Sequence, residues 1–395
     1  MENLTHSLIG AAMAELALPG GPTPNQRRIF FVAGVVAANL PDADLLYTRI
    51  TPEPLGYLLH HRGHTHTVAG LVAQVLLIGA VCLLPAIRRN VGSLRGRLWT
   101  LIAVALLSHL VLDAWNSYGV HPFWPFDVQW YYGDAIYILE PWIWLLLGVA
   151  ATANTQGARG RVVLAVALAA IVGALARFGM IPVGALIALA LVAAAMAVIV
   201  RRWAPRRRSG VALAMVALFV VAMFGLREQV RARVVASIAP VTRGQIVDVV
   251  LSPQPANPLC WTALVIAVNE PVDEYLSTPG TATTFGRSGC GARRRAPVEW
   301  GDPVHQSLSQ LRELNRRDCE VRAWLRFGRA PEIGVRAIGD LRYGGARREN
   351  FSTMPLSREG QLSRCPPNVP PWGMPRADLL GAVRREITAS STPST

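Results

Sequence analysis

The stretch Ile181–Val200 reads IPVGALIALALVAAAMAVIV and contains no charged side chain. A helix of about 20 apolar residues is long enough to cross the hydrocarbon core of a bilayer, which is roughly 30 Å thick. This stretch therefore predicts a transmembrane helix and places the chain among membrane proteins. Comparable apolar runs occupy Val68–Ile87, Leu98–Leu112, Ile136–Ala151, Val162–Ala176 and Val211–Leu226.

Two shorter apolar segments, Leu4–Leu18 and Ile29–Leu40, precede these runs. Each fits a tilted span, a half-span or an interfacial helix, so the sequence predicts six to eight membrane segments. No basic residue precedes the first segment, and His6 lies inside it, which argues against a cleaved signal peptide.

The composition supports this division of the chain. Of the 395 residues, 52% are hydrophobic and only 16% are charged, whereas soluble domains carry roughly 25% charge. This excludes a disordered chain, a small disulfide scaffold and a coiled coil. The predicted fold is mainly α: a polytopic α-helical membrane domain followed by a small α+β soluble domain. The expected parts are 1–152 with the functional site, additional membrane helices in 153–226, a soluble domain in 227–385 and a disordered tail in 386–395.

The basic residues, all 39 of them arginine, predict an orientation for the membrane segments. If every segment crosses the bilayer, one face carries Arg27, Arg28, Arg88, Arg89, Arg95, Arg97, Arg159, Arg161, Arg201, Arg202, Arg206, Arg207 and Arg208. The opposite face carries only Arg49, Arg62 and Arg177. Basic loops favour the cytoplasm, so we expect a protein of the bacterial inner membrane with both termini and the soluble domain outside. Because the net charge of +14 arises largely beside apolar runs, we expect no nucleic-acid partner.

Four cysteines lie in the C-terminal part: Cys260, Cys290, Cys319 and Cys365. An even number suits disulfides in an oxidising compartment, but the spacing does not define the pairing, and four free thiols are an equal alternative.

Seven of the eight histidines fall within the first 121 residues, among several carboxylates. Asn39-Leu-Pro-Asp-Ala-Asp44 follows the second segment. His60-His-Arg-Gly-His-Thr-His-Thr67 precedes the third, and Ser108-His-Leu-Val-Leu-Asp113 ends the fourth. With His6 at the start and His121 in a loop, the predicted topology brings all of them to the outer face. Ionisable groups at membrane depth are costly and mark functional sites.

The spacing of these residues is compatible with metal ligation. His109 and Asp113 are four residues apart and share one helix face. We expect His6, Asp42, Asp44, His61, His66, His109 and Asp113 to bind a divalent ion, with zinc preferred and manganese or iron as alternatives. The carboxylates Asp42, Asp44 and Asp113 are the candidates for a catalytic base. Hydrogen bonding between helices or helix capping is the structural alternative.

Further polar residues surround this predicted site. His60, His64 and His121 are candidates for supporting positions behind the ligands, and Glu140, just before Pro141, is a candidate further ligand. The aromatic stretch Trp115–Trp130 favours a membrane-interface belt, with a roof over the site as the alternative.

The combined motifs resemble the YdjM/YbcI-type family of membrane-bound metal-dependent hydrolases. The matching positions are His6, Pro41 through Asp44, His61 through Thr67 and Ser108 through Asp113, and they cover about the first 150 residues. The resemblance implies a helical metal-dependent hydrolase related to the zinc phospholipase C type. Glu140 stands where aspartate is more usual, and the resemblance supplies no substrate.

The C-terminal part predicts strands at Gln245–Leu251, Trp261–Val268, Glu320–Phe327 and Val335–Tyr343. Val304–Asn315 predicts an amphipathic helix that carries the eighth histidine, His305, at the surface. Arg293–Arg295 predicts a solvated loop, and Ile387–Thr395 a polar, disordered tail.

These observations favour a membrane hydrolase that cleaves a phosphoester or related bond of a lipid or envelope substrate at the outer interface. A metal-ion transporter or sensor and a non-catalytic scaffold are the alternatives. The bilayer is the expected partner, and the sequence leaves the oligomeric state undefined.

Overall fold

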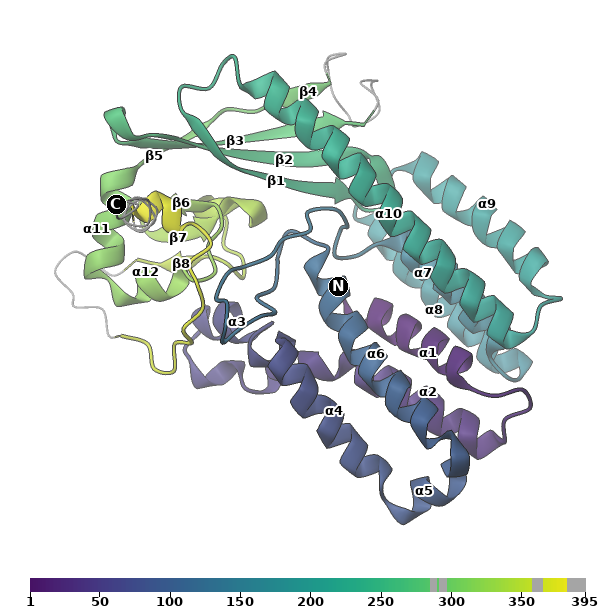
Figure 1. The fold of residues 1–395 in the computed structure, drawn as a ribbon. Coiled ribbons are helices and arrows are strands. Elements are labelled where there is room, and N and C mark those ends of the chain that lie inside the picture. The colour runs from purple at the N-terminus through teal and green to yellow at the C-terminus, as the bar shows by residue number, and fades with distance from the viewer. Residues whose placement is uncertain (285–289, 291–296, 357–364, 382–395) are drawn as a thin grey trace, which may run out of the picture.

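The computed structural model describes residues 1–284, 290, 297–356 and 365–381. Its N-terminal 240 residues are a bundle of helices that lie side by side (Figure 1). The long helices are α1 Asn3–Ala17, α2 Pro24–Asn39, α4 Val68–Cys82, α6 Arg95–Ala114, α7 Pro141–Asn154, α8 Ala158–Arg177, α9 Val183–Val200 and α10 Pro205–Ile238. Short helical segments connect them: η1 Leu40–Leu46, η2 Thr48–Ile50, α3 Leu55–His60, η3 His64–His66, α5 Pro85–Val91 and η4 Gly92–Leu94.

The predicted membrane segments correspond to these helices. Among the described residues, five helical stretches are long and apolar enough to cross a bilayer, or six if α4 and the bent segment before it form one span. Helices α1 and α7 have 15 and 14 residues and are shorter than a full span needs. The mainly α, polytopic fold is thus confirmed.

Helices α1 and α2 pack closely through small residues. A Cβ atom at Gly10 would lie 2.4 Å from the carbonyl oxygen of Gly34, so neither position tolerates a larger side chain without separating the helices. Small residues at such a contact are typical of membrane helix pairs. Behind this contact, Ala14, Ala37 and Ala38 are buried, which fixes the end of α2 that leads into η1.

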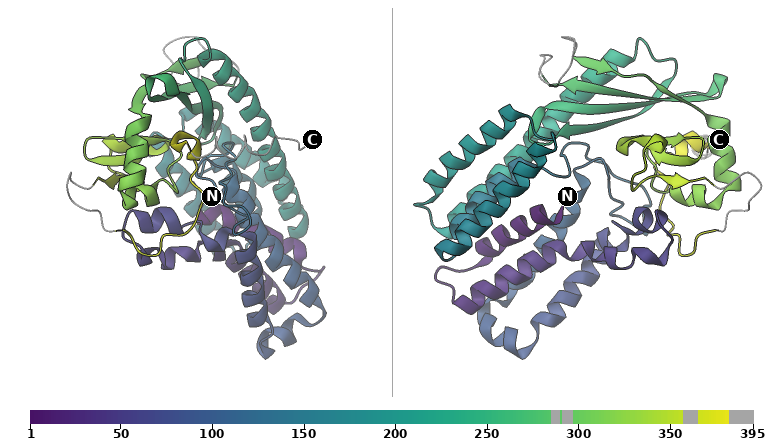
Figure 2. Two further views of the ribbon diagram at one scale, coloured as in Figure 1. Left: turned by 60° about the vertical axis from the view of Figure 1, so that its left-hand side comes forward. Right: turned by 180° about the vertical axis from the view of Figure 1, so that it is seen from behind.

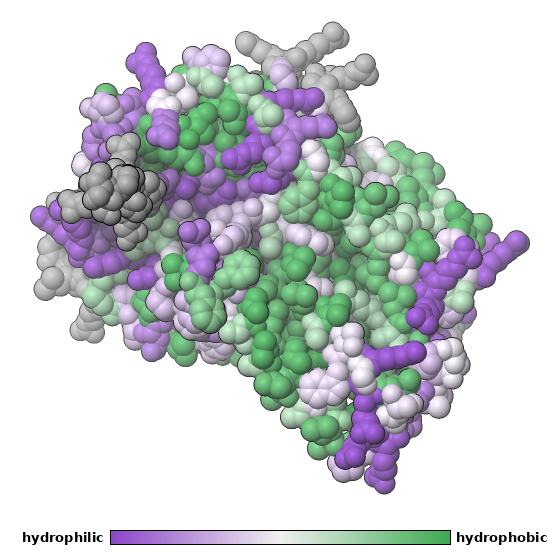
Figure 3. Space-filling view, in the orientation of Figure 1, coloured by the Kyte–Doolittle hydropathy of each residue, from purple (hydrophilic) through white to green (hydrophobic). Residues whose placement is uncertain are grey.

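The connections between helices divide into two sets. One end of the bundle holds helix α5 and the connections α1–α2, α7–α8 and α9–α10, and the strands lie at the other end (Figures 1 and 2). A hydrophobic belt crosses the visible face of the bundle between hydrophilic ends (Figure 3). This arrangement agrees with the arginine pattern, while the orientation in the cell stays a prediction.

Helix α10 continues well beyond the apolar run that defines it in the sequence. Its last three turns bury Val230, Val234 and Ile238 in the same core as Val249 of the sheet. The sequence boundary at residue 226 therefore falls inside one continuous helix, which joins the membrane bundle rigidly to the C-terminal part.

The C-terminal part contains two antiparallel sheets. In the larger one, β1 pairs with β2, β2 with β3, and β3 with both β4 and β5. The smaller has the order β6-β7-β8. The bounds are β1 Gln245–Gln254, β2 Asn257–Asn269, β3 Glu274–Thr283, β4 Val298–Trp300, β5 Val304–Ser307, β6 Pro331–Ile333, β7 Ala337–Asp340 and β8 Met354–Pro355, with helices α11 Leu308–Arg317 and α12 Cys319–Trp324. The strands predicted at Gln245–Leu251 and Trp261–Val268 are confirmed.

Two predictions for this part are wrong in detail. Glu320–Phe327 alternates polar and apolar residues like a strand, yet Asp318 accepts bonds from the amides of Glu320 and Val321 and starts helix α12. The helix predicted from Val304 begins only at Leu308, because the preceding residues pair with β3.

The remaining C-terminal predictions are settled only in part. Val335–Tyr343 forms the strand β7 followed by a 3-10 turn. His305 is at the surface as expected, although its Nδ1 contacts the Glu274 carboxylate. Arg293–Arg295 and Ile387–Thr395 lie outside the described residues.

The four C-terminal cysteines form two disulfides, Cys260–Cys290 and Cys319–Cys365. The fifth cysteine, Cys82 in α4, is a free thiol. The second disulfide ties the segment from residue 365 to α12. That segment returns to the membrane bundle, where the indole Nε1 of Trp372 donates to the carbonyl of Leu59 at 2.7 Å.

A buried ion cluster joins the two parts of the chain. The Arg329 guanidinium binds the Asp134 carboxylate through two bonds of 2.8 Å and also contacts Asp248 at 2.8 Å. Burial opposes ionisation of Asp248, but the adjacent Arg329 outweighs it and lowers the pKa of the carboxyl. Because Asp134 belongs to the loop before α7, this cluster fixes the C-terminal sheets over the end of the bundle.

Candidate metal centre

The candidate metal centre lies where four separate elements meet. His6 comes from α1, Asp42 and Asp44 from η1, His61 and His66 from the turn around η3, and His109 and Asp113 from α6. Pro41 lies in the first turn of the tight η1 helix that carries both aspartates. Arg62 has φ +61°, a conformation uncommon for residues other than glycine, which reverses the chain between the two histidines.

Four ligand atoms converge in a cluster consisting of Asp42, His66, His109 and Asp113. The Nε2 atom of His66 lies 3.0 Å from Nε2 of His109 and 3.3 Å from Oδ2 of Asp113. Oδ1 of Asp42 lies 3.5 Å from His66 Nε2 and 3.4 Å from His109 Nε2. Three of the four residues are fully buried, and Asp42 has 9% of its side chain exposed.

These separations fit a tetrahedral ion. Bond lengths of about 2.1 Å to nitrogen and oxygen ligands place neighbouring ligand atoms about 3.4 Å apart in a tetrahedron. The cluster therefore has the size and the donor set of a transition-metal site, with two imidazoles and two carboxylates. It could hold a metal ion, and it does not identify which one.

The hydrogen bonds of the two imidazoles support the same conclusion. Nδ1 of His109 lies 2.7 Å from the carbonyl oxygen of Ala38, which can only accept, so this nitrogen carries the proton. Nδ1 of His66 similarly lies 3.1 Å from Oδ2 of Asp44. In the neutral rings both Nε2 atoms then carry lone pairs that face each other and two carboxylates. Such an arrangement is repulsive unless a proton or a metal ion lies between them.

Asp44 serves chiefly to orient its neighbours. Its Oδ2 atom accepts from the amide of Arg62 at 2.8 Å and from the hydroxyl of Thr65 at 3.0 Å, besides the contact with His66. Its Oδ1 atom lies 3.2 Å from Nδ1 of His61. With both oxygens engaged, Asp44 has the position of a carboxylate that fixes metal-binding histidines from behind.

His61 and His6 flank the four-atom cluster on different sides. His61 stacks on Tyr57 and keeps 13% of its side chain exposed, and it forms a second potential ligand group with Asp42 and Asp44. His6 is fully buried and stacks on His109 with ring centres 3.8 Å apart. Its Nε2 lies 3.4 Å from Oδ1 of Asp113, an atom that also contacts the amino group of Met1.

The sequence prediction missed Arg62 as a site residue. The arginine pattern counts Arg62 as an orientation marker, but its side chain is 1% exposed, and its Nε lies 2.9 Å from Oδ2 of Asp113. Its Nη1 also donates to the carbonyls of Asp113 and Gly119 and to Asn116. The signal was its place inside the His61-Arg62-Gly63 motif, beside a glycine and between two predicted ligands.

The three candidate supporting histidines lie outside the metal cluster. His60 Nε2 contacts the Thr51 hydroxyl at 2.8 Å, whereas His64 and His121 pack against the indole of Trp372. Burial without a hydrogen-bond partner for either ring nitrogen lowers the pKa of His121 to about 3. These rings therefore support the loops around the site and its contact with the C-terminal part.

Glu140 is also separate from the cluster. It is the N-cap of α7, and its carboxylate accepts from the amide of Trp142 at 3.2 Å. Burial raises the pKa of Glu140 to about 8. The structure thus gives Glu140 a capping contact, and the described residues include no potential ligand group that contains it.

The aromatic stretch Trp115–Trp130 divides between the two roles predicted for it. Phe126 is almost fully exposed, as an interfacial residue would be. Tyr118 is buried, with its ring 4.6 Å from the guanidinium of Arg62 and 5.9 Å from the ring of His61. Trp124 and Trp130 pack with the C-terminal part. Part of the stretch therefore covers the site, which is the less favoured of the two roles that the sequence predicts.

The fold and the cluster define a multi-pass membrane protein with a buried histidine and aspartate centre at one end of its helix bundle. Residues 1–182 match the family model described as YdjM inner membrane protein, which confirms the resemblance predicted from the motifs. The matched region ends just before α9, so α9, α10 and the sheets lie beyond it.

One curated relative is the "Uncharacterized protein YfhP" of Bacillus subtilis (strain 168). It is 27% identical over 148 residues, which are 37% of this chain and 43% of the relative. The aligned region thus spans less than half of either protein. No solved structure gives a significant match to the chain.

Proposed function

We propose that this protein is a membrane-embedded, metal-dependent hydrolase that acts on a phosphoester of a lipid or envelope substrate. The observation that carries the proposal is the convergence of His66, His109, Asp42 and Asp113 around a position of tetrahedral size. Zinc is the preferred ion, with manganese or iron as alternatives, because the donors are imidazole nitrogens and carboxylate oxygens. A bound ion of this kind supplies Lewis acidity and a water that ionises near neutral pH.

The exposed groups of the centre define where a substrate would approach. Asp42 and His61 are the members with measurable exposure, whereas His66, His109 and Asp113 are sealed from solvent. Both side chains lie in the segments around η1 and η3, which follow the end of α2. A phosphoester at headgroup level could reach them while the hydrocarbon chains stay in the bilayer, provided that the predicted orientation holds.

The candidate for moving a proton is His61. Asp44 holds its Nδ1 at 3.2 Å, which leaves Nε2 for a water or a leaving group. A carboxylate that orients an imidazole in this way is a recurrent general acid–base pair. We therefore assign proton transfer to the Asp44–His61 pair. Asp42 and Asp113 remain with the ion, and Arg62 offsets the negative charge of Asp113.

A metal-ion transporter is the main competing function. Transport needs polar groups along the spans, yet the only charge between Val162 and Val200 is Arg177. Uptake of zinc or manganese by proteoliposomes would favour the transporter. A non-catalytic scaffold would tolerate replacement of His66 and Asp113 with its cellular function intact.

The test is a hydrolysis screen with the purified, metal-loaded chain against phospholipids, isoprenoid phosphates, nucleic acids and acyl esters. Hydrolysis of a lipid phosphoester that falls at least tenfold in His61→Gln while the bound metal is retained would support the proposal. His305→Gln is the matched control, because His305 also contacts a carboxylate but lies in the C-terminal part. Hydrolysis that is equal in His61→Gln and wild type would contradict the assignment of His61.

A further inference from the structure

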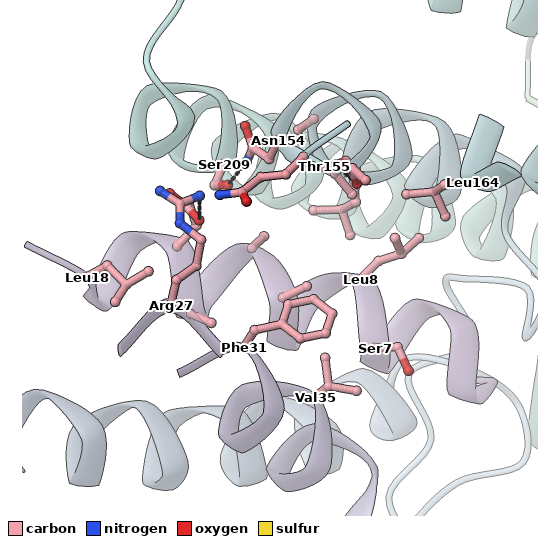
Figure 4. A pocket seen from close by; sticks show the side chains of 18 of the residues that line it. Ser7, Leu8, Leu18, Arg27, Phe31, Val35, Asn154, Thr155, Leu164 and Ser209 are labelled. Atoms are coloured by element: carbon pink, nitrogen blue, oxygen red, sulfur yellow. Dashed lines mark hydrogen bonds and ion pairs between the residues drawn. The ribbon is translucent and has the colours of Figure 1, made fainter. Parts of the chain in front are cut away.

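A separate cavity of about 500 Å³ lies inside the helix bundle, between α1 and α2 on one side and α7, α8 and α10 on the other (Figure 4). Its size is that of a site for a small ligand. It does not include any residue of the metal centre. The residues that line it come from helices that lie side by side in the bundle (Figure 1).

The long walls of the cavity are apolar. On α1, Leu4, Leu8 and Ala11 face it at helical spacing, and Phe31 and Val35 face it from α2. The Phe31 side chain is 52% exposed although it is large and apolar. Figure 4 shows Phe31 and Leu8 on the same side of the cavity, with the α7 and α8 residues opposite. Such walls offer water no hydrogen-bond partners, whereas a hydrocarbon chain packs favourably against apolar side chains.

One end of the cavity is polar and positively charged. Arg27 lines this end, with its Nη1 atom 3.2 Å from the Glu15 carboxylate. The exposed Arg28 also lines it and is the next residue in the chain. Among the described residues Arg28 forms no ion pair. Across the cavity, Asn154 donates to the hydroxyl of Ser209 at 3.1 Å (Figure 4). This end therefore offers guanidinium and amide donors at the arginine-rich end of the bundle.

We infer that this cavity binds one hydrocarbon chain of an anionic phospholipid, whose phosphate lies at Arg27 and Arg28. The cavity lies among the membrane helices, so lipid is the molecule that surrounds it at the highest concentration. Charge complementarity selects the anionic headgroup, because two arginines face a single carboxylate at this end. The wall between Leu4 and Glu15 rises roughly 16 Å along α1, which accommodates much of a chain but no headgroup at its apolar end.

The bound lipid would join two halves of the bundle. The core that contains α2 and most of α6 is separate from the core that contains α7 and α10, and α1 and α6 contribute to both. A chain between α2 and α8 fills the space that these cores leave. The inference is independent of hydrolysis and of the metal centre, so either can fail without the other.

Native mass spectrometry of the purified full chain tests this site, with dioleoyl phosphatidylglycerol and dioleoyl phosphatidylcholine as probes. We expect one phosphatidylglycerol to be retained per chain, at least tenfold more tightly than phosphatidylcholine. Arg28→Gln should reduce that preference by at least fivefold while it leaves the Arg27–Glu15 pair intact. Ala11→Phe should displace both lipids because it fills the cavity.

The matched control is Arg88→Gln, which removes an exposed arginine of α5 that does not line the cavity. It should leave lipid retention unchanged. Equal retention of the two lipids by wild type, or unaltered retention in Ala11→Phe, would overturn the inference. The inference would also be overturned by a lipid-free dimer that dissociates in Ala11→Phe. In that case a helix of a second copy would fill the space. A melting temperature raised by phosphatidylglycerol in wild type and not in Arg28→Gln would support the inference independently.

Discussion

The Nε2 atoms of His66 and His109 face each other at 3.0 Å, and in the neutral rings neither of them carries a proton. Asp44 and the carbonyl of Ala38 hold the protons on the opposite nitrogens. Each imidazole is therefore turned toward the same point, and two carboxylates complete the cluster. This relationship is the structural basis of the proposed metal centre.

Metal removal should destabilise the protein. An ion that binds only the folded chain stabilises it by about 2.7 kcal/mol at a free concentration 100-fold above its dissociation constant. We expect dialysis against a chelator to lower the melting temperature in detergent and re-addition of zinc or manganese to restore it. His109→Ala should melt at the same temperature with and without the ion. A chelator effect of equal size in His109→Ala would place the responsible ion elsewhere.

Arg62→Gln should strongly destabilise the chain. The substitution leaves the buried Asp113 without its guanidinium partner, and loss of one member of a buried ion pair costs about 3–5 kcal/mol. Thermal unfolding in detergent measures the effect, with Arg88→Gln as the exposed control. A metal-loaded Arg62→Gln protein as stable as wild type would show that the ion alone balances Asp113.

The ion cluster between the loop before α7 and the C-terminal sheets should hold these parts together. Arg329→Met leaves the buried Asp134 without its cation, whereas Asp248 keeps Arg376, so we expect a loss of about 3–5 kcal/mol and faster proteolysis of the C-terminal part. Arg336→Met changes an exposed arginine nearby and should have no such effect. Identical proteolysis rates in the two variants would argue that the apolar contacts of this interface suffice.

Glu140 should make stability fall as the pH rises. Burial raises the pKa of Glu140 to about 8 in the folded chain, above the ordinary value of 4.5. Below pH 4.5 the carboxyl is protonated in both states, and its full contribution is present. Between pH 4.5 and 8 the unfolded chain ionises first, so this contribution is lost progressively.

Melting curves at pH 5 and pH 8.5 measure this dependence. Between pH 5 and pH 8.5, the free energy of unfolding of Glu140→Gln should rise relative to that of wild type by more than about 1 kcal/mol. One pKa unit corresponds to 1.36 kcal/mol. Glu349→Gln, at an exposed position, is the control. A pH dependence that is the same in all three proteins would mean that Glu140 is ionised in the folded state.

The disulfides test the predicted orientation of the chain. If the C-terminal part lies outside the cytoplasm, peptides joined through Cys260–Cys290 and Cys319–Cys365 should be recovered from protein prepared without reductant. Cys319→Ser should lower stability by about 2–4 kcal/mol. A reporter fused after Thr395 should be active only outside the cytoplasm. A cytoplasmic reporter together with free thiols would reverse the proposed orientation.

The sequence predicts the membrane bundle well because a long apolar run has few alternatives to a spanning helix. Val183–Val200 is one such run, and its helix begins two residues after the predicted start. The end of α10 could not be predicted, because Val230, Val234 and Ile238 are buried by strands far away in the sequence. Helix α12 was missed because one cap residue, Asp318, outweighs the alternating pattern that follows it.

The sequence predicts most of the residues that form the candidate site, but not the contacts that each of them makes there. The spacing of His109 and Asp113 places both on one face of α6, and the topology brings His66 and Asp42 to the same end. Asp44 orients two histidines from behind, and Arg62 is buried against Asp113. Both arrangements depend on contacts between η1, η3 and α6. No local pattern encodes those contacts.

The central claim is that His66, His109, Asp42 and Asp113 hold one transition-metal ion, and elemental analysis of the purified protein tests it most directly. We predict close to one equivalent of zinc, manganese or iron per chain in wild type and in the control His305→Ala. Folded His66→Ala and Asp113→Ala proteins should retain little of that metal, with folding checked by gel filtration and circular dichroism. Metal content equal to that of wild type in both folded variants would contradict the claim.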